Sequence, residues 1–411
     1  MIHLNQTLFV GIDVSKLSNH IFAMNDTRQK LLSVRVDNSQ DGAIQLEQKL
    51  QSLLQSRLFT HLIIALESTG VYSAHLATFL SASKILALFD VRVYIINPKM
   101  AKNYRRSFTD IDKTDPNDAY VLADLARIGR LDGLTPFKGS QRLALERLTR
   151  HRLHIAELIS TEKVYALNNV FLKFSNFETL FSNNFGSTAV DLLLEYKSID
   201  DIIDASLEDL MTFVSKSSHN RFDNLQAIAD KIQTAARASY RLDQVAYDPI
   251  NLSLASSINL IRCYEAEIKQ IDEAILRQVA GFNQNHYTVL TSIPGIGKVY
   301  AAGILAEIAD ISQFPSDDAL AKYAGITWRQ NQSGAFYAED TFLTKTGNRY
   351  LRYFIFQAAQ KAALLIPEYR DFYQKKYNEV TTHQHKRALA LTARKLVRLL
   401  FGLLSANRLF Q

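Results

Sequence analysis

The chain has 411 residues, of which 47% are hydrophobic and 21% charged, and its formal net charge is +6. This length predicts two or three domains with apolar cores, and the ordinary composition excludes a disordered or collagen-like chain. The single cysteine, Cys263, excludes an intramolecular disulfide framework and a cysteine-based zinc site, and it favours a reducing cytosol. The N-terminus lacks a signal-peptide pattern, and no window approaches the roughly eighteen uninterrupted apolar residues of a membrane span. We therefore expect a cytoplasmic protein without a membrane partner, whose mild positive charge permits a polyanionic one.

Short apolar runs and helical patterns alternate over the first hundred or so residues. Turn signals between the first three runs indicate an antiparallel meander. The predicted elements are strands at 8–13, 20–24 and 31–36, a helix at 42–56, a strand at 61–66, a helix at 72–83 and a strand at 91–96, stopped by Pro98. This is the order of the RNase H-like fold, in which the first and fourth strands lie side by side in a mixed sheet. We expect such an α/β domain over residues 1–140, although many α/β domains share most of this order.

Residues 115–176 are predicted to be almost wholly helical, with a long helix at 143–174, and a second long helix is predicted at about 252–281. Shorter helices are expected between them, at about 180–250, so that residues 141–285 form a long-helix, coiled-coil region. In the second helix, isoleucines and a tyrosine three and four apart form an apolar seam, at Ile261, Tyr264, Ile268, Ile271 and Ile275. The two helices could pack on each other as an antiparallel hairpin or on their copies in a dimer, and the pattern leaves both arrangements open.

Four carboxylates are the candidate metal ligands of the chain. Asp13 ends the first predicted strand and Glu67 ends the fourth, so neighbouring strands would bring both side chains to the same end of the sheet. Asp115 and Asp118 are three residues apart at a helix start and face the same side. Mg²⁺ is a hard cation that prefers such oxygen ligands. Two Mg²⁺ ions about 4 Å apart are a standard device for in-line attack on a phosphodiester.

Each of these acids also has an interpretation without a metal. An Asp at a strand end is most often a turn residue. Asp115, followed by Pro116, suits a helix N-cap, and Asp118 suits the third position of a capping box. A first strand with Gly-Ile-Asp also opens the sugar-kinase and actin ATPases, but their further Gly-rich phosphate loops are not found here. The convergence of three separate segments favours the metal site.

The C-terminal region, residues 286–411, is predicted to be mostly helical. Its Pro-Gly-Ile-Gly segment matches the helix-hairpin-helix pattern, in which Gly295 and Gly297 let backbone N–H groups approach a DNA phosphate beside Lys298. The same segment also suits a plain helix connector. A polar loop then places Ser333 before a glycine, where a hydroxyl is easily approached, although polar loops commonly contain serines.

Basic side chains in this region are candidate contacts to a nucleic-acid backbone. Beyond residue 380 the chain has no Asp or Glu. An amphipathic helix with a solvated basic face would show the same pattern. The candidates are Arg329, Lys345, Arg349, Arg352, Lys386, Arg387 and Arg394.

Together these motifs resemble one family, the DEDD transposases of bacterial insertion sequences, which are relatives of the Piv/MooV invertases and are now understood as bridge-RNA-guided recombinases. The family pattern is Gly-Ile-Asp-Val-Ser-Lys, then Glu-Ser-Thr-Gly, then Lys-Thr-Asp-x-x-Asp-Ala. It is present here at residues 11–16, 67–70 and 113–119. The C-terminal domain of the family resembles residues 293–297, 325–334 and 347–349.

The resemblance implies that Asp13, Glu67, Asp115 and Asp118 form a RuvC-like acidic tetrad holding Mg²⁺. It implies that Ser333 is the nucleophile of a C-terminal transposase domain and forms a covalent phosphoserine link to DNA. It further implies donor and target DNA, a structured non-coding guide RNA, and a homodimer that assembles to a tetramer. A bacterial, nucleoid-associated location would follow.

Three points stay open at this stage. Asp110 and Asp112 crowd the third motif, so the acids that bind metal are not fully assigned. A RuvC-like metal nuclease that uses water, with Ser333 as a bystander, is the main alternative function. A nucleic-acid-binding protein with an inactive RNase H-like domain is another.

Overall fold

The structure is a computed structural model that describes residues 4–68, 70–109, 111–131, 134, 136–137, 139–328, 332–333, 336–337 and 342–411. The chain divides into two compact units, one formed by residues 148–277 and the other by residues 1–147 together with 278–411. The domain boundaries expected after residues 140 and 285 stay predictions. Among the described residues, no helix combines the length and apolar character that crossing a membrane requires.

A five-stranded mixed sheet begins the chain. Its strands lie in the order β3-β2-β1-β4-β5, so the first and fourth strands are neighbours, as predicted. β1 and β4 are parallel with Ile12 opposite Leu66, whereas β1 and β2 are antiparallel with Asp13 opposite His20. The strands are β1 (Thr7–Val14), β2 (Ser18–Met24), β3 (Lys30–Asp37), β4 (His61–Glu67) and β5 (Asp90–Ile96).

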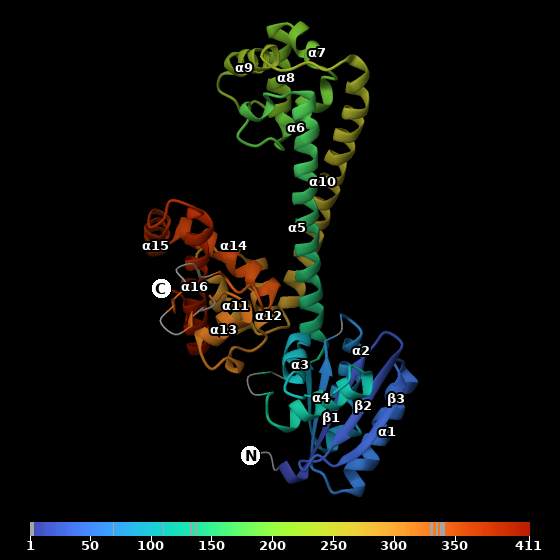
Figure 1. Cartoon of the computed structure of the whole chain (residues 1–411). Coiled ribbons are helices and arrows are strands. Elements are labelled where there is room, and N and C mark those ends of the chain that lie inside the picture. The colour runs from blue at the N-terminus through green and yellow to red at the C-terminus, as the bar shows by residue number, and fades with distance from the viewer. Residues whose placement is uncertain are drawn as a thin grey trace. The chain divides into compact units, whose positions relative to one another are not determined.

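Helices cover both faces of this sheet (Figure 1). Side chains alternate along a strand, so Leu8, Val10 and Ile12 of β1 pack on one face with α1 (Gln40–Ser56) and α2 (Ser73–Ala82), while Phe9 packs on the other. That second face is covered by α3 (Pro98–Arg105) and α4 (Asp115–Arg127). The predicted strands and the two predicted helices of this region are confirmed.

Helix α3 was missing from the prediction, which took Pro98 only as the end of a strand. The side chain of Asn97 caps the helix by accepting a hydrogen bond from the N–H of Lys99 at 2.8 Å, and Pro98 lies in the first turn, where its missing N–H costs nothing. The long helix predicted at 143–174 is confirmed as α5 (Ser140–Lys173). α4 ends at Arg127, and Gly129 directly after its C-cap takes a positive φ of 75°, as is common at helix ends. Gly139, with a φ of 87°, precedes the first residue of α5.

Gly11 allows α4 to pack directly against β1. A Cβ atom at Gly11 would lie 2.0 Å from the carbonyl oxygen of Ala119 and 2.3 Å from the backbone nitrogen of Ala123. Asp13 follows two residues later and therefore points to the same side of the sheet. This contact brings the first turn of α4 to the end of β1.

The unit of residues 148–277 is built on an antiparallel helical pair, α5 (Ser140–Lys173) and α10 (Gln244–Val279), seen side by side in Figure 1. Three polar contacts join them along their length, between Arg152 and Asp272, Lys163 and Glu265, and Lys173 and Asn251. Of the two arrangements left open by the sequence, the intrachain hairpin is therefore present. The shorter helices between them are α6 (Ser187–Glu195), α7 (Ile199–Asp204), α8 (Leu207–Ser218) and α9 (Leu225–Arg237).

α10 begins eight residues before its predicted start at residue 252, and it contains Pro249. A proline inside a helix removes one hydrogen bond, here the one to the carbonyl of Val245. Val245 is 82% exposed, so water can hydrogen-bond to this carbonyl and the helix tolerates the proline.

The C-terminal region consists of six α-helices and one small hairpin in its described part. The polar loop predicted around Ser333 contains this hairpin, in which β6 (Gln332–Ser333) pairs with β7 (Phe336–Tyr337). A separate antiparallel bridge joins Trp328 and Leu343. The helices are α11 (Gln284–Thr291), α12 (Lys298–Ile308), α13 (Asp317–Ala324), α14 (Arg349–Leu365), α15 (Pro367–Asn378) and α16 (Gln384–Ala406).

Candidate active site

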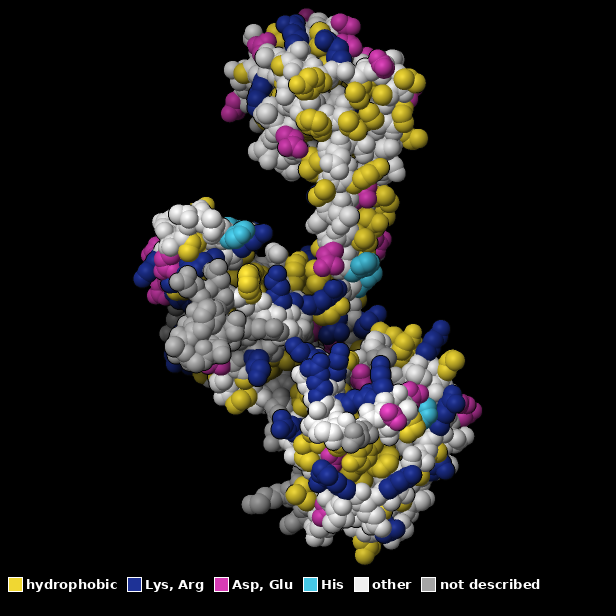
Figure 2. Space-filling view, in the orientation of Figure 1, with side chains coloured by type: hydrophobic (Ala, Val, Ile, Leu, Met, Phe, Trp, Pro, Cys, Tyr) yellow, Lys and Arg dark blue, Asp and Glu magenta, His cyan; other side chains and the backbone are white. Residues whose placement is uncertain are grey.

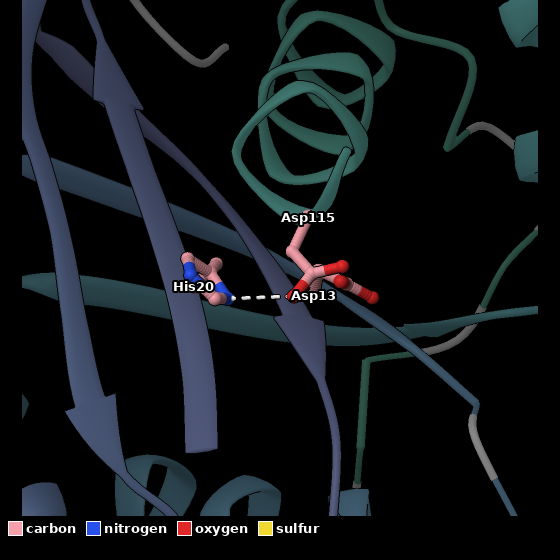
Figure 3. A group of neighbouring side chains, drawn as sticks. All are labelled: Asp13, His20 and Asp115. Carbon is pink, nitrogen blue, oxygen red and sulfur yellow. Dashed lines mark ion pairs between the residues drawn. The ribbon is translucent and has the colours of Figure 1, made fainter. Parts of the chain in front are cut away.

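Asp13, His20 and Asp115 come together at the end of β1 (Figure 3). Each offers one ligand atom, and these atoms all lie within 4.8 Å of one another. Nδ1 of His20 is 3.4 Å from a carboxylate oxygen of Asp115. Two of the three residues were predicted from the sequence, and they come from segments about a hundred residues apart.

Burial and neighbouring negative charge act on the carboxylates around Asp13. Burial and the neighbouring negative charges of Glu67, Asp115 and Asp118 raise the pKa of Asp13 to about 6. Burial and the charge of Asp118 also raise the pKa of the Glu67 carboxyl. A divalent cation would relieve this repulsion, and carboxylates with an imidazole are a ligand set that such cations accept. The described residues therefore fit a metal ion.

The other two predicted ligands lie close by but outside the group of three. Glu67 ends β4 directly after Leu66, which is paired with Ile12, and it therefore neighbours Asp13 across the two strands. Asp118 lies one helical turn beyond Asp115, and its carboxylate forms an ion pair of 2.7 Å with Arg105.

The helix-capping interpretation of the two α4 acids is wrong. The N-cap of α4 is Thr114, and Asp115 is the first helical residue. The carboxylate of Asp118 turns to Arg105, while its backbone N–H donates to the carbonyl of Thr114 at 2.9 Å. The backbone carbonyl of Asp112 accepts a hydrogen bond of 3.0 Å from Asn117, and Asp110 lies outside the described residues.

His20 was missed because it belongs to no predicted motif. The feature that predicts its position is the tight turn between β1 and β2. In this turn the N–H of Ser15 donates to the carbonyl of Ser18 at 3.0 Å. That turn fixes the antiparallel register and puts His20 opposite Asp13.

A fully buried carboxylate holds α4 in place beneath the cluster. Asp124 accepts hydrogen bonds from the Tyr104 hydroxyl at 2.7 Å and from Nε of Arg127 at 2.8 Å, and Nε of Arg28 lies 3.2 Å away. A buried charge is tolerated only with such partners. The network joins α3, α4 and the turn between β2 and β3.

The two glycines of the predicted helix-hairpin-helix have different surroundings. Gly295 has φ +96°, and a Cβ atom there would lie 2.8 Å from Cβ of Lys361 and 2.9 Å from the backbone nitrogen of Ala362, so its close approach is to α14. Gly297 is the N-cap of α12, and a Cβ atom there would meet nothing within 4 Å. Gly297 and Lys298 are exposed, and their contact with a phosphate stays a prediction.

Several predicted nucleic-acid contacts already have protein partners. Arg352 donates to the carbonyls of Ala324 and Lys345, both at 3.1 Å. Arg394 pairs with Asp317 and Asp318, and Arg387 pairs with Glu379. The one-signed charge after residue 380 is thus partly neutralised by acids from α13 and from just after α15.

Of the remaining predicted residues, some are exposed and others lie wholly or partly outside the described residues. Lys345, Arg349 and Lys386 are exposed, and the guanidinium of Arg349 lies 4.8 Å from the ring centre of Tyr350. The backbone of Ser333 lies in β6, opposite Phe336. The side chain of Ser333 and the whole of Arg329 lie outside the described residues.

Comparison with known proteins gives a consistent family. Residues 10–171 match a DEDD transposase model of the IS110 type, and residues 287–374 match the model described as transposase of the IS116/IS110/IS902 family. A 42 kDa protein of insertion element IS900 from Mycobacterium paratuberculosis is 24% identical over 98% of this chain and 97% of that protein. The pilin gene-inverting protein of Moraxella lacunata is 24% identical over 98% and 97% of the two chains. The chain therefore belongs to the IS110/IS116/IS902 family of transposases, enzymes that recombine DNA.

Proposed function

We propose that this transposase cuts and rejoins DNA at a composite site of carboxylates and a serine. The carboxylates Asp13, Glu67, Asp115 and Asp118 would belong to a RuvC-like domain of RNase H-like fold and hold Mg²⁺. The observation that carries the proposal is the cluster of Asp13, His20 and Asp115 within 4.8 Å, in a chain of the transposase family. The strand order β3-β2-β1-β4-β5 supports the assignment of the fold.

The protein residues would bind the metal ion and hold the ligand oxygens at a fixed spacing. When bound, a divalent cation neutralises charge on the scissile phosphate and lowers the pKa of a hydroxyl next to it. Asp13 and Asp115 would provide ligand oxygens from β1 and α4, and Glu67 would complete the acidic rim from β4. The rigid contact of α4 with β1 at Gly11 keeps these oxygens at a fixed spacing.

Ser333 would supply the nucleophile. Its hydroxyl loses a proton and its oxygen forms an ester bond to the scissile phosphorus, while the bond to one DNA oxygen breaks and that oxygen takes up a proton. The reverse step, with a hydroxyl of another strand, rejoins the DNA and frees the serine. Because one ester replaces another, no external energy source is required.

A structured non-coding RNA would specify the target and donor DNA in this proposal. Base pairing would then carry the sequence information, and the protein would need mainly backbone contacts. The net charge of +6 and the exposed side chains of Lys298, Lys345, Arg349 and Lys386 support this division of roles. The protein would act as a homodimer that assembles to a tetramer.

The test is a cleavage reaction with purified protein, its RNA, Mg²⁺ and DNA carrying an end of the insertion element. The wild type and the exposed-serine control Ser256→Ala should both leave a protein–DNA adduct on a denaturing gel, and Ser333→Ala should leave none. Cleavage that persists without an adduct would favour the water-using nuclease. Rejoining by Ser333→Ala, or full cleavage by Asp13→Ala, would contradict the proposal. Recombination that survives RNase treatment would remove the guide RNA from it.

A further inference from the structure

Arg105 is in contact with one of the four proposed metal ligands. Its Nη1 lies 2.7 Å from a carboxylate oxygen of Asp118, and the two side chains are 19% and 23% exposed. Its Nη2 donates to the backbone carbonyl of Ile111 at 3.4 Å. A guanidinium that is paired with a carboxylate, anchored by a second bond and mostly shielded from water is held more firmly than a surface ion pair.

This pair explains the geometry of the acidic cluster. Asp115 and Asp118 lie one turn apart on α4, yet only Asp115 has an oxygen within 4.8 Å of ligand atoms of both Asp13 and His20. Asp118 turns to Arg105 instead. An arginine carries its positive charge at every physiological pH, so it competes with a cation for this carboxylate.

We propose that Arg105 competes with a metal ion for the Asp118 carboxylate, and that a nucleic-acid phosphate that binds the guanidinium releases this carboxylate. The inference rests on the proposed metal centre. Guanidinium binds phosphate and carboxylate with the same two-pronged geometry, so a phosphate oxygen can replace the Asp118 oxygen. The released carboxylate is then free to bind the cation.

The surroundings of Arg105 suit a phosphate backbone. Arg105 lies in the last turn of α3, which carries no acidic residue, and Lys99, Lys102 and Arg106 on or directly after this helix are exposed. Figure 2 shows Lys and Arg side chains gathered over this part of the α/β domain. A DNA strand bound along these cations would reach Arg105 beside the acidic cluster.

The inference predicts that nucleic acid and cation strengthen each other's binding through Arg105. We would measure Mn²⁺ binding by isothermal titration calorimetry, with and without a short mixed-sequence DNA duplex. Without DNA, Arg105→Gln should bind Mn²⁺ about fivefold more tightly than the wild type, because the competing ion pair is gone. DNA should tighten Mn²⁺ binding by the wild type by a similar factor and leave that of Arg105→Gln almost unchanged.

Two controls separate this inference from its premise. Lys49→Gln removes an exposed charge from α1, which packs on the opposite face of the sheet from α3, and it should keep the wild-type coupling between DNA and Mn²⁺. Asp13→Asn should abolish Mn²⁺ binding. If Asp13→Asn abolishes binding and Arg105→Gln changes neither the affinity nor the coupling, the role of Arg105 is refuted and the metal centre stands. If the wild type binds no Mn²⁺ with or without DNA, both are refuted. If Arg105→Gln does not fold, Arg105→Lys replaces it in the test. This variant keeps the charge but loses the planar guanidinium, so its coupling between DNA and Mn²⁺ should be weaker than that of the wild type.

Discussion

Gly11 and Ala119 are in backbone contact: a methyl group on Gly11 would lie 2.0 Å from the carbonyl oxygen of Ala119. This contact decides where α4 lies on β1, and therefore where Asp115 lies relative to Asp13. The glycine of the Gly-Ile-Asp motif thus has a packing function that is separate from any contact with substrate.

Replacing this glycine tests its packing role. Gly11→Ala should lower the free energy of unfolding by about 3 kcal/mol, because a backbone oxygen cannot move away as a flexible side chain could. Urea unfolding followed by far-UV circular dichroism measures the change. Gly402→Ala is the control, since a Cβ atom in that α16 position meets nothing within 4 Å, and it should stabilise the helix by about 0.5 to 1 kcal/mol. Equal stability of Gly11→Ala and wild type would contradict the packing role.

The pKa of Asp13 predicts a pH dependence of stability in the metal-free protein. Burial and the neighbouring carboxylates raise this pKa to about 6 in the folded state, so folding favours the protonated form. The stabilisation is complete below the unfolded pKa of 3.8 and is lost as the pH rises through 6. Asp13→Asn cannot lose a proton and should be more stable than the wild type at pH 7 by about 1 kcal/mol, a value reduced for the partial exposure of the carboxyl.

This difference is measured by urea unfolding in EDTA at pH 4 and pH 7, since titrating groups far from Asp13 cancel between the two proteins. At pH 4 the two stabilities should nearly coincide. Adding a divalent cation at pH 7 should stabilise the wild type only, because the variant lacks the ligand. A difference that is the same at both pH values would show that Asp13 ionises normally.

His20 should influence which cation the cluster prefers. Imidazole suits Co²⁺ better than Mg²⁺, so His20→Gln should weaken Co²⁺ binding by about tenfold or more and Mg²⁺ binding less. The visible absorption of Co²⁺ reports its binding, and displacement by Mg²⁺ reports the competing affinity. His75→Gln, an exposed histidine of α2, is the matched control. Equal losses for both cations would mean that His20 only orients Asp115.

Asn348 ties the start of α14 to a buried acid. Its side-chain oxygen accepts from the N–H groups of Tyr350 and Leu351 at 3.0 Å, and its amide donates to the carboxylate of the fully buried Glu307 at 2.6 Å. Asn348→Asp keeps the cap but places a second carboxylate against Glu307. The variant should lose about 3 kcal/mol of stability, more than the loss of about 1 kcal/mol expected for the cap alone. Thermal unfolding should show no comparable loss for the exposed Asn259→Asp.

The strand order and two residues of the cluster could be predicted because they depend on local patterns. The apolar runs fixed the strands, and the neighbourhood of β1 and β4 then followed from their order. His20 and Arg105 could not be found in this way. The position of His20 depends on the register set by a turn, and that of Arg105 on a helix whose starting proline was taken for a strand end.

The basic C-terminal stretch shows a second limit of sequence patterns. A run without acids looks free to bind phosphate, yet Asp317 and Asp318 lie against Arg394 from a helix about seventy residues earlier. Charge that is unbalanced along the chain is balanced in space, and only the tertiary structure shows this. The glycine of Pro-Gly-Ile-Gly that contacts α14 is a similar case.

The ion pair of Arg152 with Asp272 joins the two ends of the segment 148–277. A segment whose first and last turns are in contact behaves as an inserted domain. Residues at its far end can be added, removed or replaced without changing the distance between the two chain positions where the segment begins and ends. Evolution is therefore free to remodel the short helices at the tip of this insert, between α5 and α10, at little risk to the cluster at the end of β1.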